Sequence, residues 1–173
     1  MIGRGPGIVL IGFMGAGKSS AGRALARNLG WPRFDTDEMV SARMGLSIPE
    51  IFARLGEAEF RAAESEALRQ LPDNSPAIIV TGGGIVLRPE NVQALRQLGR
   101  VIHLEADEET LFRRISRRAS RPLLQTEDPR GTLGELLRVR QPLYREAAHA
   151  QVDTSRLSHE EVVEAVLKIT ETL

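Results

Sequence analysis

The chain has 173 residues, among which 23 basic and 23 acidic side chains leave no net charge, and it contains no cysteine. This length fits a single domain with a sizeable core, and the even charge gives no general reason to expect nucleic acid or a membrane surface as a partner. The lack of cysteine excludes disulfides and thiolate metal sites, and no apolar run approaches the roughly 20 residues of a membrane-spanning helix. We therefore expect one globular domain over residues 1–173, cytoplasmic and monomeric.

Short apolar runs alternate with helical patterns along the chain. In chain order, the patterns predict strand 7–11, helix 19–30, strand 32–35, helices 38–45, 47–56 and 57–71, strand 76–84, helix 89–99, strand 100–106, helix 107–119, loop 120–131, helix 132–148, strand 150–155 and helix 158–173. Strands separated by helices indicate βαβ units, so we expect an α/β fold with a parallel sheet and helices on both faces. The stretch after Arg4 could also be a weak signal peptide, but it is short and broken by glycine.

A phosphate-binding loop follows the first predicted strand. Gly12, Gly17, Lys18 and Ser19 match the pattern G-x-x-x-x-G-K-[ST], in which backbone N–H groups and a helix N-terminus surround a phosphate. Gly15 lets the backbone turn inward, Lys18 reaches the β- and γ-phosphates, and the hydroxyl of Ser19 can ligate Mg²⁺. A plain glycine-rich connection would not explain the lysine and the serine.

Two carboxylates end the second predicted strand. Asp35 and Asp37 would face the same side of an extended segment, toward the ligand crevice at the carboxyl edge of the sheet. One of them can hold Mg²⁺ through water, and the other can orient or deprotonate a hydroxyl acceptor. Alternatively, Asp37 is the N-cap of a helix that begins at Glu38.

Arginines and glycines further along are candidates for the acceptor side. Arg61 lies on an amphipathic helix, where an ordinary surface pair with Glu64 is the alternative to a role in the site. Glycines 82–84 end a strand and would bring bare backbone close to a ligand, unless they form a plain turn. Arg140 comes just before Pro142, and its guanidinium could bind a carboxylate through two nitrogens.

A cluster of arginines ends the predicted helix 107–119 and extends beyond it. Its members are Arg113, Arg114, Arg117, Arg118 and Arg121. Most of them fit a solvated helix end that the helix dipole favours. One or two could belong to a mobile lid that closes over ATP and supplies an arginine to the transferring phosphoryl group.

Together these motifs resemble those of the shikimate kinases. The resemblance rests on GFMGAGKSS, DTD, IPEIFARLGEAEFRAAE, TGGGIV, SRPLL and RQPLYR in this order, and it extends from Ile8 to about Arg156. It implies a three-layer α/β/α P-loop kinase fold with a five-stranded parallel sheet, a substrate-binding region near 35–64 and a lid near 115–127. It also implies ATP-dependent phosphorylation of the 3-hydroxyl of shikimate, a step toward chorismate and the aromatic amino acids.

The resemblance assigns roles to individual positions. ATP would be bound by Gly15, Ala16, Gly17, Lys18, Ser19, Ser20, Arg114, Arg121 and Arg156. Shikimate would be bound by Asp37, Arg61, Gly82, Gly83, Gly84 and Arg140. Lys18, Asp37 and Arg121 would act in the transfer, and Ser19 and Asp35 would hold Mg²⁺.

Two other interpretations stay open at this point. A gluconate kinase or a nucleoside monophosphate kinase would share the loop and the fold, but would not be expected to combine Asp37, Arg61, the three glycines and Arg140. A non-catalytic nucleotide-binding module would be expected to lack Lys18, Asp37 or one of these arginines, and none is lost. The chain carries no helix-turn-helix or basic arm, so we expect small-molecule ligands and no nucleic acid.

Overall fold

The computed structural model describes residues 6–117 and 126–171. Five parallel strands form one sheet in the order β2-β3-β1-β4-β5, which confirms the predicted α/β architecture. The strands are β1 (Gly7–Ile11), β2 (Arg33–Asp35), β3 (Ile78–Val80), β4 (Gly99–Glu105) and β5 (Ala150–Asp153). Because β1 is the central strand, the loop that follows it lies at the middle of the carboxyl edge of the sheet, where α/β proteins bind their ligands.

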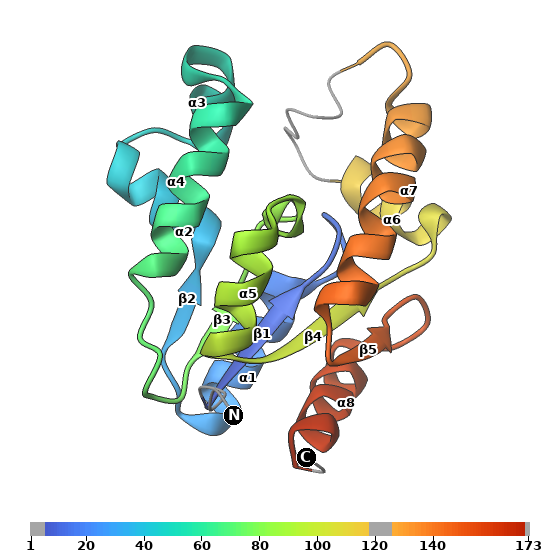
Figure 1. Ribbon diagram of the computed structural model, residues 1–173. Coiled ribbons are helices and arrows are strands. Elements are labelled where there is room, and N and C mark those ends of the chain that lie inside the picture. Colours follow the sequence, from blue (N-terminus) through green and yellow to red (C-terminus); the bar gives the residue numbers. More distant parts are fainter. Residues whose placement is uncertain (1–5, 118–125, 172–173) are drawn as a thin grey trace.

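The helices form a layer on each face of this sheet. They are α1 (Lys18–Leu29), α2 (Thr36–Met44), α3 (Ile48–Leu55), α4 (Glu57–Arg69), the 3-10 turn η1 (Ile85–Leu87), α5 (Pro89–Leu98), α6 (Glu108–Ser116), α7 (Pro129–Ala147) and α8 (His159–Glu171). Helices α1 and α8 pack against each other on one face, and α5 and α7 cover the other (Figure 1). No helix within the described ranges is both long and apolar enough to cross a bilayer.

The apolar core lies between the sheet and these two layers. Residues 8–11 of β1 are at most 2 % exposed, as expected for a strand that is covered on both faces and reads as one continuous apolar run. A second, smaller cluster joins α2, α3 and α4 through Val40, Ile51, Phe60 and Ala67. Figure 1 shows these three helices together beside β2, across the molecule from α6 and α7.

Two helices begin two or more residues earlier than the sequence patterns predict. Helix α2 begins at Thr36, because the carboxylate of Asp35 accepts hydrogen bonds from the N–H groups of Asp37 (3.1 Å) and Glu38 (3.4 Å). The N-cap is therefore Asp35, and the alternative that gave this place to Asp37 is wrong. Helix α7 begins at Pro129, so residues 129–131 are helical and do not belong to the predicted loop. An aspartate N-cap followed by proline at the first helical position explains this start.

Candidate active site

The phosphate loop connects β1 to α1 and is shaped by its glycines. Gly15 (φ 83°) and Gly17 (φ 97°) adopt left-handed backbone conformations that other residues rarely tolerate. The ammonium group of Lys18 donates hydrogen bonds to the carbonyl oxygens of Gly12 (2.7 Å) and Phe13 (2.9 Å). No acidic residue lies in the first turn of α1, so the positive end of this helix is available to an anion.

A cavity of about 430 Å³ adjoins this loop, a volume within the usual range for small-molecule sites. It is lined by Gly15, Ala16, Gly17, Ser20, Arg114, Arg117, Thr154, Leu157, His159 and Val162. Arg114 donates hydrogen bonds to the carbonyl oxygen of Gly15 (3.3 Å) and to both oxygens of Thr154 (3.0 and 2.8 Å). It thereby ties α6 to the phosphate loop at the wall of the cavity.

The structure supports no contact with this cavity for one of the arginines expected at the ATP site, and another is not described. Arg156 is exposed in the connection after β5 and is not among the lining residues. Arg121, and most of the expected lid over 115–127, lie outside the described residues. Thr154, which the sequence analysis missed, lines the cavity and accepts from Arg114. A single threonine after a strand carries no sequence signal of its own.

A polar crevice continues from the phosphate loop toward β2 and β3. It is lined by Met14, Gly15, Gly17, Lys18, Ser19, Ser20, Asp35, Asp37, Thr81 and Gly83. The carboxylate of Asp35 is engaged as the N-cap of α2 and, 3.3 Å away, with the guanidinium of Arg33. Burial is the main cause that raises the pKa of Asp35 above its usual value. No group of three or more histidine or acidic side chains suited to a metal occurs in the described ranges.

A second pocket opens beside this crevice. It is lined by Met14, Asp37, Ile48, Phe52, Phe60, Arg61, Gly82, Gly83, Gly84 and Arg140. Three of these residues, Met14, Asp37 and Gly83, also line the polar crevice. The structure therefore places the predicted acceptor residues in one pocket that is continuous with the phosphate loop.

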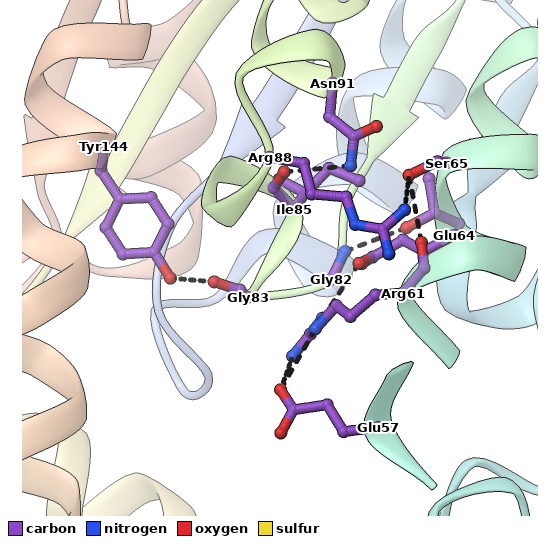
Figure 2. Close-up of polar contacts among 11 residues, drawn as sticks. Glu57, Arg61, Glu64, Ser65, Gly82, Gly83, Ile85, Arg88, Asn91 and Tyr144 are labelled. Carbon is purple, nitrogen blue, oxygen red and sulfur yellow. Dashed lines mark hydrogen bonds and ion pairs between the residues drawn. The ribbon is translucent and has the colours of Figure 1, made fainter. Parts of the chain in front are cut away.

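Arg61 lies in this pocket between two carboxylates of its own helix. Its Nη1 donates to Glu64 at 2.9 Å, and its Nε and Nη2 donate to one oxygen of Glu57 at 3.3 and 3.1 Å (Figure 2). Arg61 and Glu64 are buried, so the alternative that they form an ordinary surface ion pair is wrong. Burial raises the pKa of Glu64 to about 7, although Arg61 opposes this shift.

Arg140 projects from α7 into the same pocket. It is 3 % exposed, and its guanidinium carbon lies 5.8 Å from the centre of the Phe13 ring. One turn later on α7, the hydroxyl of Tyr144 donates a hydrogen bond to the carbonyl oxygen of Gly83 (Figure 2). The sequence analysis missed Tyr144, because a tyrosine on a helix is most simply read as part of an apolar face.

Comparisons with known proteins agree with this arrangement. A family model described as shikimate kinase matches residues 14–171. The shikimate kinase of Thermodesulfovibrio yellowstonii is 43% identical over 166 residues, 96% of this chain and 95% of that protein. The shikimate kinase of Thioalkalivibrio sulfidiphilus is 48% identical over 159 residues, 92% of this chain and 84% of that protein.

Solved structures give the same result. The chain superimposes on a shikimate kinase from Acinetobacter baumannii in complex with shikimate, with a TM-score of 0.92, 37% identity, and coverage of 96% of this chain and 93% of that chain. A gluconokinase from Sinorhizobium meliloti 1021 gives a TM-score of 0.59 at 21% identity over 98% of this chain and 94% of that chain. At that identity the likeness shows a shared fold alone.

Proposed function

The chain belongs to the shikimate kinase family, and on that basis we propose that the site described above carries out the reaction of this family. The protein is a kinase that transfers the γ-phosphoryl group of ATP to the 3-hydroxyl of shikimate in aromatic amino acid biosynthesis. One observation supports the placement of the reaction: the acceptor pocket and the phosphate crevice share Met14, Asp37 and Gly83. An acceptor in the pocket would thus have a hydroxyl beside the terminal phosphate, and positioning supplies much of the catalysis in phosphoryl transfer.

The acceptor residues would divide the recognition of shikimate between them. Arg61 and Arg140 would bind its carboxylate, and Gly82, Gly83 and Gly84 would line the pocket. The carboxylate of Asp37 would accept hydrogen bonds from the hydroxyls and aim one of them at the phosphate. This division fits a substrate that has one anionic end and several hydroxyls.

The donor residues would bind ATP and neutralise the charge that develops on the transferring group. Lys18 would leave the carbonyls of Gly12 and Phe13 for the phosphates, and backbone N–H groups of residues 15–20 would surround them. We assign further ATP contacts to Arg114 and Arg156, and a contact with the transferring phosphoryl group to Arg121 in a lid over 115–127.

A kinase of this family uses ATP together with a divalent metal ion, and we propose that the ion is Mg²⁺. The hydroxyl of Ser19 would be one ligand, and Asp35 would act through a water molecule, since its own oxygens already cap α2 and contact Arg33. When bound with ATP, the ion offsets the negative charge of the phosphates.

We also propose that the chain acts as one domain and as a monomer in the cytoplasm, on small molecules and without nucleic acid. The balanced charge of the chain supports this view, because nothing in it favours a polyanionic partner. Sedimentation equilibrium at micromolar concentration tests the monomer directly, and a mass of twice 19.0 kDa would contradict it.

The test of the proposed function measures ADP release from ATP–Mg²⁺ with shikimate, quinate, gluconate or AMP as acceptor. We expect turnover with shikimate, and a loss of at least about a hundredfold in kcat for Asp37→Asn, the size of effect typical for a group that orients or deprotonates the acceptor. Turnover with gluconate or AMP but not shikimate would contradict our reading of the acceptor pocket. Full activity of Asp37→Asn would contradict the role of this carboxylate.

A further inference from the structure

Arg61 is already paired with two carboxylates before any acceptor arrives. Its Nη1 is bound to Glu64, and the edge formed by Nε and Nη2 is bound to Glu57 (Figure 2). That edge is one of the two on a guanidinium that can bind a carboxylate through two parallel hydrogen bonds, and the other, formed by Nη1 and Nη2, is shared between Glu64 and Glu57. An acceptor carboxylate therefore meets Glu57 at either edge of Arg61.

The two partners of Arg61 differ in how easily they can leave. The side chain of Glu64 is 0% exposed, and one of its oxygens has no hydrogen-bond partner among the described residues. The side chain of Glu57 is 46% exposed and lies in the first turn of α4. Glu57 can turn into water without being buried elsewhere, and the positive end of the helix still stabilises it there.

The charges around the pocket also favour the departure of Glu57 from Arg61 when an acceptor binds. Arg61 and Arg140 face three carboxylates, those of Asp37, Glu57 and Glu64. A carboxylate on the acceptor would be the third to contact a single guanidinium if Glu57 stayed in place. Like charges at such short distances oppose binding, whereas exchange of one carboxylate for another keeps the charge on Arg61 balanced.

We propose that Glu57 is a resident competitor for the acceptor carboxylate: it occupies the Nε/Nη2 edge of Arg61 in the free site and is displaced by the acceptor. The inference rests on the proposed function, in which Arg61 binds the carboxylate of shikimate. Glu57 then lowers the affinity for shikimate, and it keeps the buried guanidinium paired while the pocket is empty. Arg140, the other arginine proposed to bind the acceptor carboxylate, has no ion pair with a carboxylate among the described residues, so this competition acts at Arg61 only.

The experiment compares Glu57→Gln with wild type by isothermal titration of shikimate into the full chain without nucleotide. We expect the dissociation constant to fall by about twofold to fivefold, the range for a partly exposed ion pair that no longer has to be broken. Affinity for ADP should not change. The matched control is Glu59→Gln, which removes the same charge from the same first turn of α4, where Glu59 is exposed and forms no ion pair with a described residue.

The outcomes separate the inference from the function on which it rests. Tighter binding in Glu57→Gln but not in Glu59→Gln supports the competition. Unchanged or weaker binding in Glu57→Gln, or an equal gain in both variants, overturns it, because Glu57 would then hold Arg61 in place or act only through its general charge. Failure of the wild type to bind shikimate would instead overturn the proposed function, and this inference with it.

Discussion

Three successive glycines let charged side chains come close to the end of β3. A Cβ atom on Gly82 would clash with the carboxylates of Glu64 and Asp37, and one on Gly84 would overlap the guanidinium of Arg61. None of these three glycines has a positive φ. For Gly82 and Gly84 the requirement is therefore space, which is filled by the charged groups of the acceptor pocket itself.

Gly84→Ala should therefore damage acceptor binding more than folding. The added methyl group would overlap the buried guanidinium of Arg61 and force it to shift, so we expect the KM for shikimate to rise by at least about tenfold, the loss of one good contact to a charged group. The KM for ATP should stay within about twofold. Gly134→Ala is the matched control, since Gly134 does not line the pocket and the nearest neighbour of its new methyl group would be a side-chain oxygen of Glu108 at 3.4 Å, an ordinary contact. Equal effects of both changes would contradict this explanation.

At the residue scale, the sequence predicts which residues belong to the site better than it predicts which residues they contact. The triple glycine is recognisable as part of a site, and its approach to a ligand stays a prediction, but the sequence does not show that Arg61 and Glu64 lie against Gly84 and Gly82. Those contacts join residues about twenty positions apart, which no local pattern contains. The assigned roles of Lys18, Asp37 and Arg140 stay predictions until the variants are measured.

At the scale of elements, α7 links the two sides of the acceptor pocket. Arg140 lines the pocket, and Tyr144, one turn later, binds the carbonyl oxygen of Gly83 through its hydroxyl. The Tyr144 ring is fully buried and stacks on the ring of His103 in β4, with 5.0 Å between centroids. Burial raises the pKa of Tyr144, so its hydroxyl stays protonated and able to donate. One side chain thus fixes α7 relative to both β4 and the glycine turn.

Tyr144→Phe keeps the ring and removes this hydrogen bond. We expect a loss of about 1–3 kcal/mol in the free energy of unfolding, because the carbonyl of Gly83 loses its partner. We also expect the KM for shikimate to rise by about threefold to tenfold while the KM for ATP is unchanged, since Arg140 and the glycine turn are no longer held in register. Denaturant unfolding and steady-state kinetics check the two effects. An equal rise in both KM values would show that α7 acts on the whole fold.

The start of a helix can be predicted from the sequence where residues next to it in the chain determine that start. The start of α3 has such local causes: Ser47 and Glu50 form a capping box, and Pro49 lies between them in the first turn. The start of α2 is harder to predict because DTD contains two possible N-caps, and the structure shows that the carboxylate of Asp35 is the one that accepts from the backbone N–H groups of Asp37 and Glu38. The packing of α2, α3 and α4 around a separate apolar cluster cannot be predicted from local patterns either, because it depends on contacts between helices.

For the whole molecule, alternation of strands and helices suffices to predict a parallel sheet, but not its order. The order β2-β3-β1-β4-β5 follows from how the crossovers pack, and it brings β2, β3 and β1 together so that their loops meet. Asp37, Gly83 and Met14, which follow these three strands, then line one continuous site. The site is thus formed by the order of the strands, and the fold around it buries charged and polar side chains, among them Glu64 and His103.

Two of these buried groups should give stability opposite dependences on pH. Glu64 has its pKa raised from 4.5 to about 7, mainly by burial, so between these values the folded state holds a proton that the unfolded chain has released. Stability from this group is present at low pH and is lost as pH rises toward 7. His103 has its pKa lowered from 6.5 to about 4, mainly by burial and then by Lys18, so the unfolded chain holds the extra proton. Its contribution to stability is lost as pH falls below 6.5.

The pH ranges over which Glu64 and His103 change the stability overlap, so their effects oppose each other in the wild type. Single variants should reveal each effect separately. We expect Glu64→Gln to destabilise the protein more at pH 5 than at pH 7.5, and His103→Gln to do so more at pH 7.5 than at pH 5. Each difference should be on the order of 1–3 kcal/mol. The stability of Glu64→Gln should rise with pH because of His103, and that of His103→Gln should fall with pH because of Glu64. Urea unfolding of the three proteins at both pH values measures this. Slopes of the same sign in the two variants would mean that one of these groups does not change its protonation on folding.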